Sequence, residues 1–268
     1  MLNGLRNEWR HFLLALGFFT RIPIPAFADF HADDLNHSIK YFPLVGVVVG
    51  MVGAGAFLLA SNIFPVSIAV LLSMATTIYI TGAFHEDGLA DSADGLGGGW
   101  GREQILTIMQ DSRLGTYGAV ALFLMLFAKF QALNALPAYF LPFILVIGHA
   151  LSRLSAVYVM ANLSYVKASG KAKPLATNVR MTDLITASLL AILPIPFIYW
   201  NFSPFLLNEM DWFWLGLYCL VPMSLVWIWW RSKIKHCLGG YTGDCLGAMQ
   251  QMTELAFYFG LLAWYQQL

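Results

Sequence analysis

The sequence predicts an all-α integral membrane protein, a polytopic helical bundle with about seven transmembrane helices. Of its 268 residues 59% are hydrophobic, only 11% are charged, and the mean hydropathy is +0.66. Several apolar runs reach the roughly 20 residues that cross a bilayer. The expected spans are about 41–61, 65–84, 117–136, 139–162, 184–201, 211–230 and 248–266. Because no linker divides the chain, residues 1–268 are expected to form one membrane-embedded catalytic domain.

The N-terminal region differs from these spans. The stretch from His11 to Phe27 is apolar but short, and Arg21, Pro23 and Pro25 interrupt it. We therefore expect an interfacial or re-entrant segment there. A signal peptide is not expected, because the apolar core covers only Phe12 to Phe19 and no small-residue cleavage pattern follows it.

The distribution of basic residues predicts the orientation of the chain. Basic and non-basic loops alternate along the sequence, which by the positive-inside rule puts the N-terminus in the cytoplasm and the C-terminus outside. The basic groups are Arg6, Arg10 and Arg21; Lys167, Lys171, Lys173 and Arg180; and Arg231, Lys233 and Lys235. We expect a multi-pass protein embedded in the lipid bilayer. The net charge of zero gives no reason to expect a nucleic acid partner. The sequence leaves the oligomeric state open, a homo-oligomer included.

The run from His85 to Gly95 contains the strongest chemical signal. Its four carboxylates are Glu86, Asp87, Asp91 and Asp94. If the run is helical, the three aspartates share one face, where like charges repel unless a cation lies between them. Hard divalent cations such as Mg²⁺ take oxygen ligands and commonly share them with substrate phosphates. The motif therefore predicts a cytoplasmic Mg²⁺ site for a phosphate-bearing substrate, and a solvated acidic loop with helix-capping aspartates is the alternative.

Two further features follow this motif. Glycines at 95, 97, 98, 99 and 101 predict a turn whose backbone N–H groups hold phosphate oxygens, with a flexible linker as the alternative. Arg113 provides a guanidinium fork that suits phosphate. A salt bridge between Arg113 and Asp111 is the alternative there.

Other polar residues occur in or beside the expected spans. His149 and Arg153 lie one helical turn apart within an apolar span, where a charge usually marks function. Snorkelling of Arg153 to the interface is the alternative. Asp244 follows a glycine-rich turn and either completes the metal shell or caps the last helix.

The sequence resembles the cobalamin synthase family, the adenosylcobinamide-GDP ribazoletransferases. The motifs that carry the resemblance are Phe18-Phe19-Thr20-Arg21-Ile22-Pro23, Tyr41-Phe42-Pro43-Leu44-Val45-Gly46, the run His85 to Gly95, the segment Met109 to Gly118, Arg153 and Thr242-Gly243-Asp244. They occur in order along nearly the whole chain. The resemblance implies that the cobinamide-phosphate moiety of adenosylcobinamide-GDP is transferred to α-ribazole, or its 5′-phosphate, with release of GMP. It also implies Mg²⁺ as the cofactor.

The site residues that we predict fall into three groups. The metal ligands are Glu86, Asp87, Asp91 and Asp94. The catalytic residues are Asp91, Asp94, Arg113 and Arg153, with Asp91 or Asp94 as the general base. The substrate-binding residues are His85, Gly88, Gly95, Arg113, His149, Arg153 and Asp244.

Two other functions compete with this interpretation. The acidic motif partly resembles that of CDP-alcohol phosphotransferases, but the arginine of that longer motif is missing here, where Asp91 follows Ala90. Such an enzyme would use a lipid alcohol and release CMP. A cation transporter would need its acidic residues at membrane depth, whereas these are expected just beyond the end of a span.

Overall fold

The computed structural model describes residues 2–25, 32–166, 179–196 and 209–267. Within these ranges the regular elements are helices, and one isolated bridge joins Tyr165 to Tyr241. In chain order they are α1 (Leu2–Phe19), α2 (Ala32–Ser38), the 3₁₀ helix η1 (Ile39–Tyr41), α3 (Phe42–Ser61), α4 (Val66–Thr81), α5 (Phe84–Gly98), α6 (Arg102–Ile108), α7 (Thr116–Ala135), α8 (Leu141–Asn162), α9 (Met181–Ile192), α11 (Glu209–Leu238) and α12 (Gly243–Tyr265). The all-α class is confirmed.

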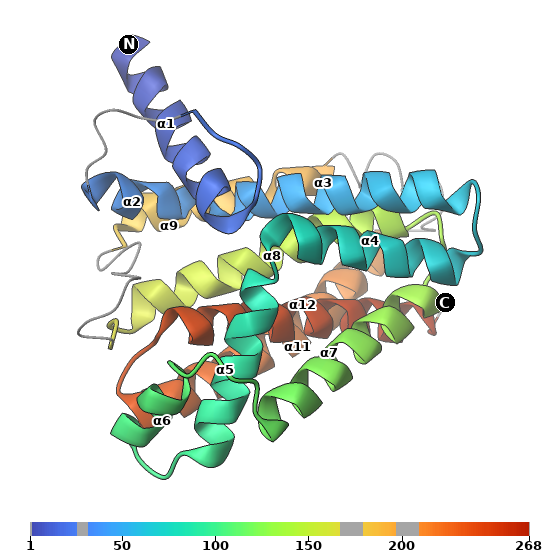
Figure 1. Cartoon of the computed structure of the whole chain (residues 1–268). Helices are drawn as coiled ribbons and strands as arrows, with labels where there is room; N and C mark the ends of the chain where they lie inside the picture. Colours follow the sequence, from blue (N-terminus) through green and yellow to red (C-terminus); the bar gives the residue numbers. More distant parts are fainter. Residues whose placement is uncertain (1, 26–31, 167–178, 197–208, 268) are drawn as a thin grey trace.

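The longer helices run back and forth between two ends of the molecule. The α3–α4 and α7–α8 connections lie at the same end as the C-terminus, and the N-terminus lies toward the opposite end (Figure 1). This alternation matches the alternation of basic and non-basic loops in the sequence. The basic residues Lys167, Lys171 and Lys173 lie outside the described residues.

The membrane character is confirmed, but the count of about seven spans is not. Helices long and apolar enough to cross a bilayer occur at Asp34–Ser61, Thr116–Ala135, Leu141–Asn162 and Asp211–Leu238. The pair α4 and α5 adds a fifth if it is counted as one bent span, with an angle of 85° at its break. Of the other two expected spans, α9 has only 12 residues, and residues 197–201 of that expected segment lie outside the described part. Helix α12 has 23 residues but is too polar to qualify.

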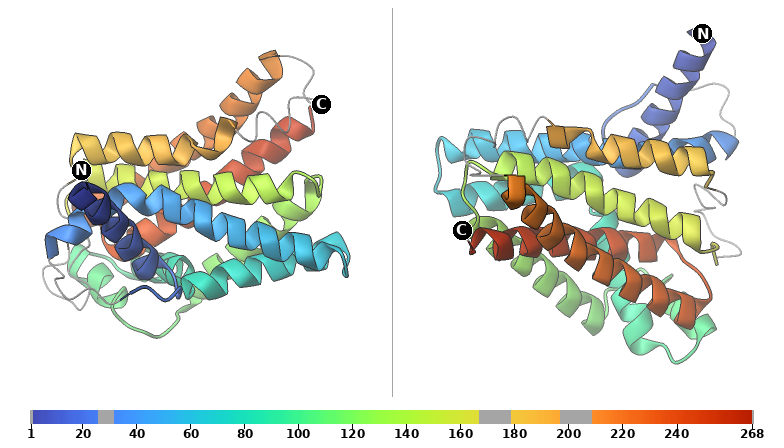
Figure 2. Two further views of the ribbon diagram at one scale, coloured as in Figure 1. Left: turned by 90° about the horizontal axis from the view of Figure 1, so that it is seen from above. Right: turned by 180° about the vertical axis from the view of Figure 1, so that it is seen from behind.

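Helix α1 projects from the bundle and is joined to it at its C-terminal end (Figure 2). Leu13, Leu16 and Phe19 are buried against the core. After α1 the backbone N–H of Arg21 donates to the carbonyl of Ile80, 2.7 Å away, which fastens this segment to the end of α4. Its interfacial or re-entrant character stays a prediction, and residues 26 and 27 lie outside the described residues.

Glycines allow the central helices to approach closely. A Cβ atom at Gly50 of α3 would lie 2.5 Å from Cα of Val146 in α8, and one at Gly46 would collide with the carbonyl of His149. At Gly148 on the same helix, a Cβ would lie 2.8 Å from the ring of Tyr258. Helix α12 therefore packs against α8 on one side and, as described below, against α5 on another (Figure 2).

Candidate active site

The acidic motif lies on a helix that turns sharply away from α4. Gly82 and Ala83 both adopt the left-handed conformation, with φ values of 65° and 58°. This is uncommon for a residue with a Cβ such as Ala83. The two residues produce the 85° break, so that α5 crosses the direction of the neighbouring helices (Figure 1). The predicted helix therefore exists, and its carboxylates are presented across the bundle.

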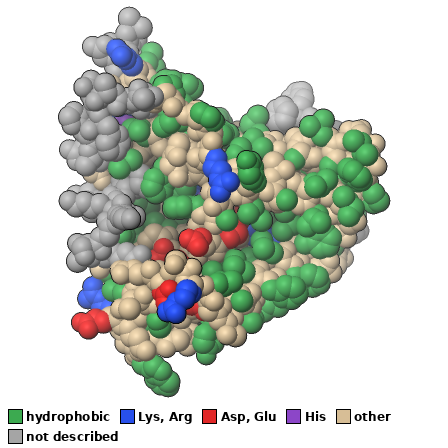
Figure 3. Space-filling view, in the orientation of Figure 1, with side chains coloured by type: hydrophobic (Ala, Val, Ile, Leu, Met, Phe, Trp, Pro, Cys, Tyr) green, Lys and Arg blue, Asp and Glu red, His purple; other side chains and the backbone are tan. Residues whose placement is uncertain are grey.

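Gly88 brings the first turns of α5 and α12 together. A Cβ at Gly88 would lie 2.9 Å from the carbonyl oxygen of Asp244, and one at Gly247 would lie 3.2 Å from that of His85. The backbone of the half-buried Asp244 therefore lies next to the part of α5 that carries the exposed Asp87 and the half-buried Asp91. Its Oδ2 accepts from the hydroxyl of Thr242, and it is Thr242, not Asp244 as the alternative had it, that caps α12. Figure 3 shows acidic side chains across the middle of this face. Gly88 thus has a packing role, and its predicted contact with substrate stays a prediction.

Asp94 is held differently from the other aspartates. Its two carboxylate oxygens accept hydrogen bonds from the backbone N–H groups of Gly115 (2.8 Å) and Gly118 (2.9 Å). These are donors at the N-terminus of α7, so Asp94 caps that helix from a neighbouring one. A Cβ at Gly115 or Gly118 would collide with the Asp94 carboxylate. The alternative of a helix-capping aspartate therefore describes the geometry of Asp94, and its metal and base roles stay predictions.

The prediction of a glycine-rich turn is wrong for its first three glycines. Gly95, Gly97 and Gly98 form the last turn of α5, and the connection to α6 begins at Gly99. A Cβ at Gly95 would lie 2.6 Å from Cγ of Met109. One at Gly97 would contact the Tyr117 ring at the same distance. These glycines allow neighbouring segments to pack on α5. Because Gly95 is buried and helical, there is no turn at this position to hold phosphate.

Glu86 points away from the exposed aspartates and into a buried polar network. Its Oε1 accepts from the side-chain amide of Gln251 at 2.9 Å, and its Oε2 is buried with no hydrogen-bond partner in the structure described here. The side-chain oxygen Oε1 of Gln251 accepts from Nζ of Lys129 at 2.7 Å. The ammonium group of Lys129 also lies 3.0 Å from Oε1 of Glu254. The network therefore links α5, α12 and α7.

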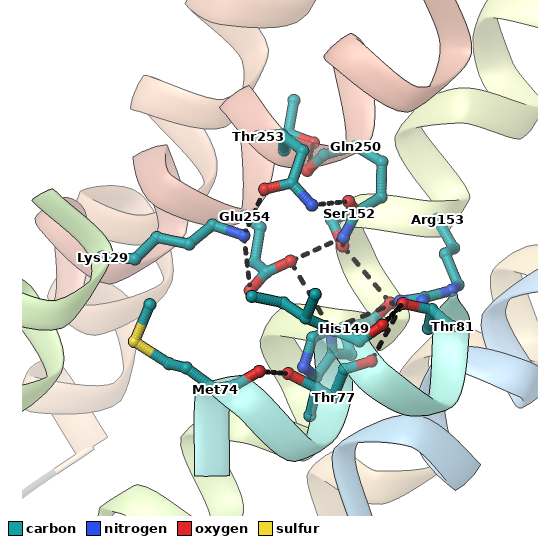
Figure 4. Close-up of polar contacts among 12 residues, drawn as sticks. Met74, Thr77, Thr81, Lys129, His149, Ser152, Arg153, Gln250, Thr253 and Glu254 are labelled. Atoms are coloured by element: carbon teal, nitrogen blue, oxygen red, sulfur yellow. Dashed lines mark hydrogen bonds and ion pairs between the residues drawn. The ribbon is translucent and has the colours of Figure 1, made fainter. Parts of the chain in front are cut away.

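Glu254 is the centre of this network (Figure 4). It accepts from Nε2 of Gln250 at 2.6 Å and from the Tyr258 hydroxyl at 3.0 Å. Nδ1 of His149 lies 3.5 Å from its Oε2. Lys129, Gln250 and Glu254 are not among the site residues that we predicted from the sequence. Their partners come from helices far apart in the chain, so spacing alone could not identify the cluster.

Arg153 and His149 belong to the same buried region. Nη1 of Arg153 donates to the backbone carbonyl of His149 at 3.0 Å, and only 2% of the arginine is exposed. Its Nε is buried without a hydrogen-bond partner among the described atoms. The alternative in which Arg153 snorkels to the interface is therefore wrong. Its predicted contact with a pyrophosphate stays a prediction, although the residue faces the bundle interior.

Arg113 and His85 are two further residues that we predicted for the site. Nη2 of Arg113 contacts Oδ2 of Asp111 at 2.6 Å, which is the predicted alternative, and 88% of the arginine side chain is exposed. The guanidinium lowers the pKa of Asp111 to about 2. His85 is buried and stacks on Phe19 with ring centroids 5.8 Å apart. The structure therefore does not bring Arg113, His85 and the α5 aspartates into one hydrogen-bonded group.

The carboxylates fit a magnesium ion that substrate helps to hold. Within the described ranges no group of three or more His, Cys, Asp or Glu side chains is arranged to bind a metal by itself. Mg²⁺, however, is commonly bound through one or two carboxylates together with substrate phosphates and water. Asp87 and Asp91, one helical turn apart on the accessible side of α5, meet that requirement. Asp94 and Glu86 are already engaged by backbone N–H groups and by Gln251.

Comparisons with known proteins agree over the length of the chain. Residues 11–262 match the family model described as cobalamin-5-phosphate synthase. A protein of Ralstonia pickettii named adenosylcobinamide-GDP ribazoletransferase is 40% identical, over 98% of this chain and 99% of its own. A protein of the same name from Shewanella amazonensis is 42% identical, over 99% of this chain and 100% of its own. No solved structure matches significantly.

Proposed function

Because the chain belongs to the cobalamin-5-phosphate synthase family, we propose that the face formed by Asp87, Asp91 and Asp244 is the active site of its transfer reaction. The protein is a transferase of cobalamin biosynthesis, because its relatives are named adenosylcobinamide-GDP ribazoletransferases. The observation that carries the site is the close packing of α5 on α12 at Gly88, which gathers carboxylates from two distant parts of the chain on one accessible side.

The reaction replaces the phosphoanhydride bond of the diphosphate by a phosphate ester bond. A hydroxyl group of α-ribazole, or of its 5′-phosphate, attacks the phosphorus attached to cobinamide. A P–O bond forms to that hydroxyl oxygen, and the bond between this phosphorus and the bridging oxygen breaks. GMP leaves with the bridging oxygen, and the product is adenosylcobalamin or its phosphate. Catalysis of such transfers depends mainly on positioning and on stabilising the charge of the phosphate oxygens.

Asp87 and Asp91 are the residues that would hold Mg²⁺. When bound, the ion neutralises charge on the diphosphate and helps to align the two reactants. Two aspartates leave most of the coordination sphere of Mg²⁺ for phosphate oxygens and water. Glu86 is not assigned to the ion, because its Oε1 accepts from Gln251 and its Oε2 is buried on the other side of α5.

Asp91 is the better of the two predicted general bases. Both oxygens of Asp94 accept backbone hydrogen bonds from α7, so this carboxylate is fixed in place and has little capacity for the acceptor's proton. Because Asp91 would also hold Mg²⁺, we propose that one of its oxygens would contact the ion while the other accepts the proton of the attacking hydroxyl, and that Asp94 has a positioning role. Arg153 is buried and donates to the backbone carbonyl of His149, and Arg113 is exposed and paired with Asp111, so a contact of either arginine with the diphosphate stays a prediction.

The chain is expected in the bacterial inner membrane, with its N-terminus and the acidic face on the cytoplasmic side. The support is the positive-inside pattern of the basic loops together with the bacterial origin of the relatives. The lipid bilayer is thus its surrounding partner. Association into a homo-oligomer stays a prediction, which light scattering of the detergent-purified protein would measure.

The activity is tested with the purified full-length protein in detergent. Adenosylcobinamide-GDP, α-ribazole and Mg²⁺ are added, and release of GMP is followed with and without a chelator. We expect release that requires both substrates and stops with chelator. CMP release from a CDP-alcohol donor in place of this reaction would contradict the proposal.

The site is tested with Asp87→Ala and Asp91→Asn. Both variants are expected to insert and fold normally but to lose transfer, because the metal ligands and the base are removed. Glu103→Gln is the matched control, since Glu103 is an exposed carboxylate of α6 outside the site. Full activity of either aspartate variant at the usual Mg²⁺ concentration would refute the assignment.

A further inference from the structure

Arg21 lies directly over the break between α4 and α5. Its backbone N–H is fixed by the hydrogen bond to Ile80, and its guanidinium carbon lies 5.2 Å from the centroid of the Tyr79 ring. A Cβ at Gly82 would lie only 3.0 Å from Nε of Arg21. The guanidinium is therefore held against the two residues that precede α5, whose first turn carries Glu86 and Asp87.

The charge of Arg21 is not neutralised by this environment. Arg21 is exposed, and within the described ranges no carboxylate forms an ion pair with it. The two arginines predicted for the diphosphate differ in this respect. Arg113 is bound at its Nε and Nη2 by Asp111, and Arg153 is buried and hydrogen-bonded to a backbone carbonyl. Figure 3 shows a basic side chain above the acidic side chains on this face.

The contact with Tyr79 orients the guanidinium without using its N–H groups. A cation over an aromatic face is attracted to the ring electrons, so the donors at the edge of the planar guanidinium stay available. These donors match the spacing of phosphate oxygens. An exposed arginine beside a carboxylate face, anchored but without an acidic partner, is suited to an anion that arrives with the substrate.

We infer that Arg21 binds a phosphate oxygen of the diphosphate in adenosylcobinamide-GDP, on the α1 side of the acidic face. This inference rests on the proposed function, which supplies the diphosphate. Arg21 and the α5 aspartates would then contact the same group, the arginine directly and the aspartates with Mg²⁺. The phosphate of a lipid headgroup has the same chemistry. It is the other source to be tested, because Arg21 follows the segment expected at the membrane interface.

The test compares Arg21→Gln with the wild-type protein in two preparations. One is a detergent micelle free of phospholipid, and the other is a nanodisc containing phosphatidylglycerol. Equilibrium binding of adenosylcobinamide-GDP and steady-state turnover are measured in both. We expect the dissociation constant and the KM for this substrate to rise about 10- to 100-fold in both preparations. The KM for α-ribazole is expected to stay within about twofold of wild type, because the acceptor carries no part of the diphosphate.

Two other variants separate charge from packing. Arg21→Lys keeps the charge without the planar fork and should restore part of the affinity. Tyr79→Leu leaves the arginine but removes the ring that orients it, and a rise of about two- to fivefold in the dissociation constant is expected. Arg102→Gln is the matched control, because Arg102 is an exposed arginine at the start of α6, and it should bind substrate as the wild type does.

The outcomes distinguish this inference from the proposed function. Unchanged substrate binding by Arg21→Gln, or an equal loss with Arg102→Gln, would overturn the role of Arg21 while wild-type turnover still supports the transfer reaction. A defect seen only in the phosphatidylglycerol nanodisc would assign Arg21 to lipid and also overturn the inference. Wild-type protein that binds the substrate but releases no GMP would count against the proposed function alone.

Discussion

Replacing Glu254 by Gln should strongly destabilise the bundle. The Glu254 carboxylate lies 3.0 Å from the Lys129 ammonium and accepts from Gln250 and Tyr258 at 2.6 and 3.0 Å, all in the interior. Glutamine keeps the size of the side chain but removes the negative charge that compensates Lys129. Removing one partner of a buried ion pair costs about 3–5 kcal/mol, because the other charge is left uncompensated. At about 2–4 °C per kcal/mol, the thermal midpoint should fall by roughly 6–20 °C.

The assay is thermal unfolding in one detergent, followed by fluorescence at one heating rate for all variants. Lys129→Met is measured in parallel, together with the double variant Lys129→Met/Glu254→Gln. If the two residues compensate one another, the double variant should lose clearly less stability than the sum of the two single losses. Ser61→Ala is the control, because Ser61 is the exposed last residue of α3. Its thermal midpoint should stay within about 1 °C of that of the wild type.

Two results would refute this reasoning. A loss of less than about 1 kcal/mol for Glu254→Gln would mean that water or other groups neutralise Lys129. Strict additivity in the double variant would mean that the two side chains do not interact, despite the 3.0 Å distance between them.

Three further outcomes are expected. Gly88→Ala should separate α5 from α12 and cost about 1–3 kcal/mol of stability together with most of the activity, whereas Gly55→Ala, with open space around it, should be neutral or slightly stabilising in thermal unfolding. Asp94→Asn should lower the thermal midpoint as well as activity, because it replaces an acceptor of two backbone N–H groups by an amide; activity lost at an unchanged midpoint would contradict the capping role. Because Arg113 lowers the pKa of Asp111 from 3.8 to about 2, the pair contributes stability above the ordinary pKa and loses it only as the pH falls toward 2. Asp111→Asn should therefore leave the shape of the turnover profile between about pH 5 and pH 9 unchanged, and a shifted limb would show that Asp111 titrates there.

Local patterns located most of the long helices. Apolar runs of span length located α3, α7 and α8 to within a few residues, because burial in lipid needs about 20 residues whatever the tertiary structure. Helix α11, by contrast, continues to Leu238, beyond the expected end at residue 230. Two small residues four positions apart are typical of a close helix contact, and Gly46 and Gly50 lie at such a contact with α8. The acidic motif is helical, which is the condition under which the sequence puts Asp87, Asp91 and Asp94 on one face.

Long-range contacts could not be predicted in the same way. The chain around Gly95 looks like a turn because glycines are frequent in turns, yet these glycines serve to admit Met109 and Tyr117 against α5. Nothing near Asp94 in the sequence indicates that Gly115 and Gly118 donate hydrogen bonds to it. In each case the decisive partner lies on another helix, and no spacing within one segment reveals it.

The fastening of Asp94 to the start of α7 has a consequence for how this sequence can change. The Asp94 carboxylate and the two glycines depend on one another, because a change in any of the three disturbs the hydrogen bonds between them. A Cβ at either glycine would collide with the carboxylate, and an alanine or asparagine at position 94 would leave at least one of the two backbone N–H groups without an acceptor. The final aspartate of the motif and the pair of glycines more than twenty positions later should thus be inherited as a set, even in descendants that no longer carry out the chemistry.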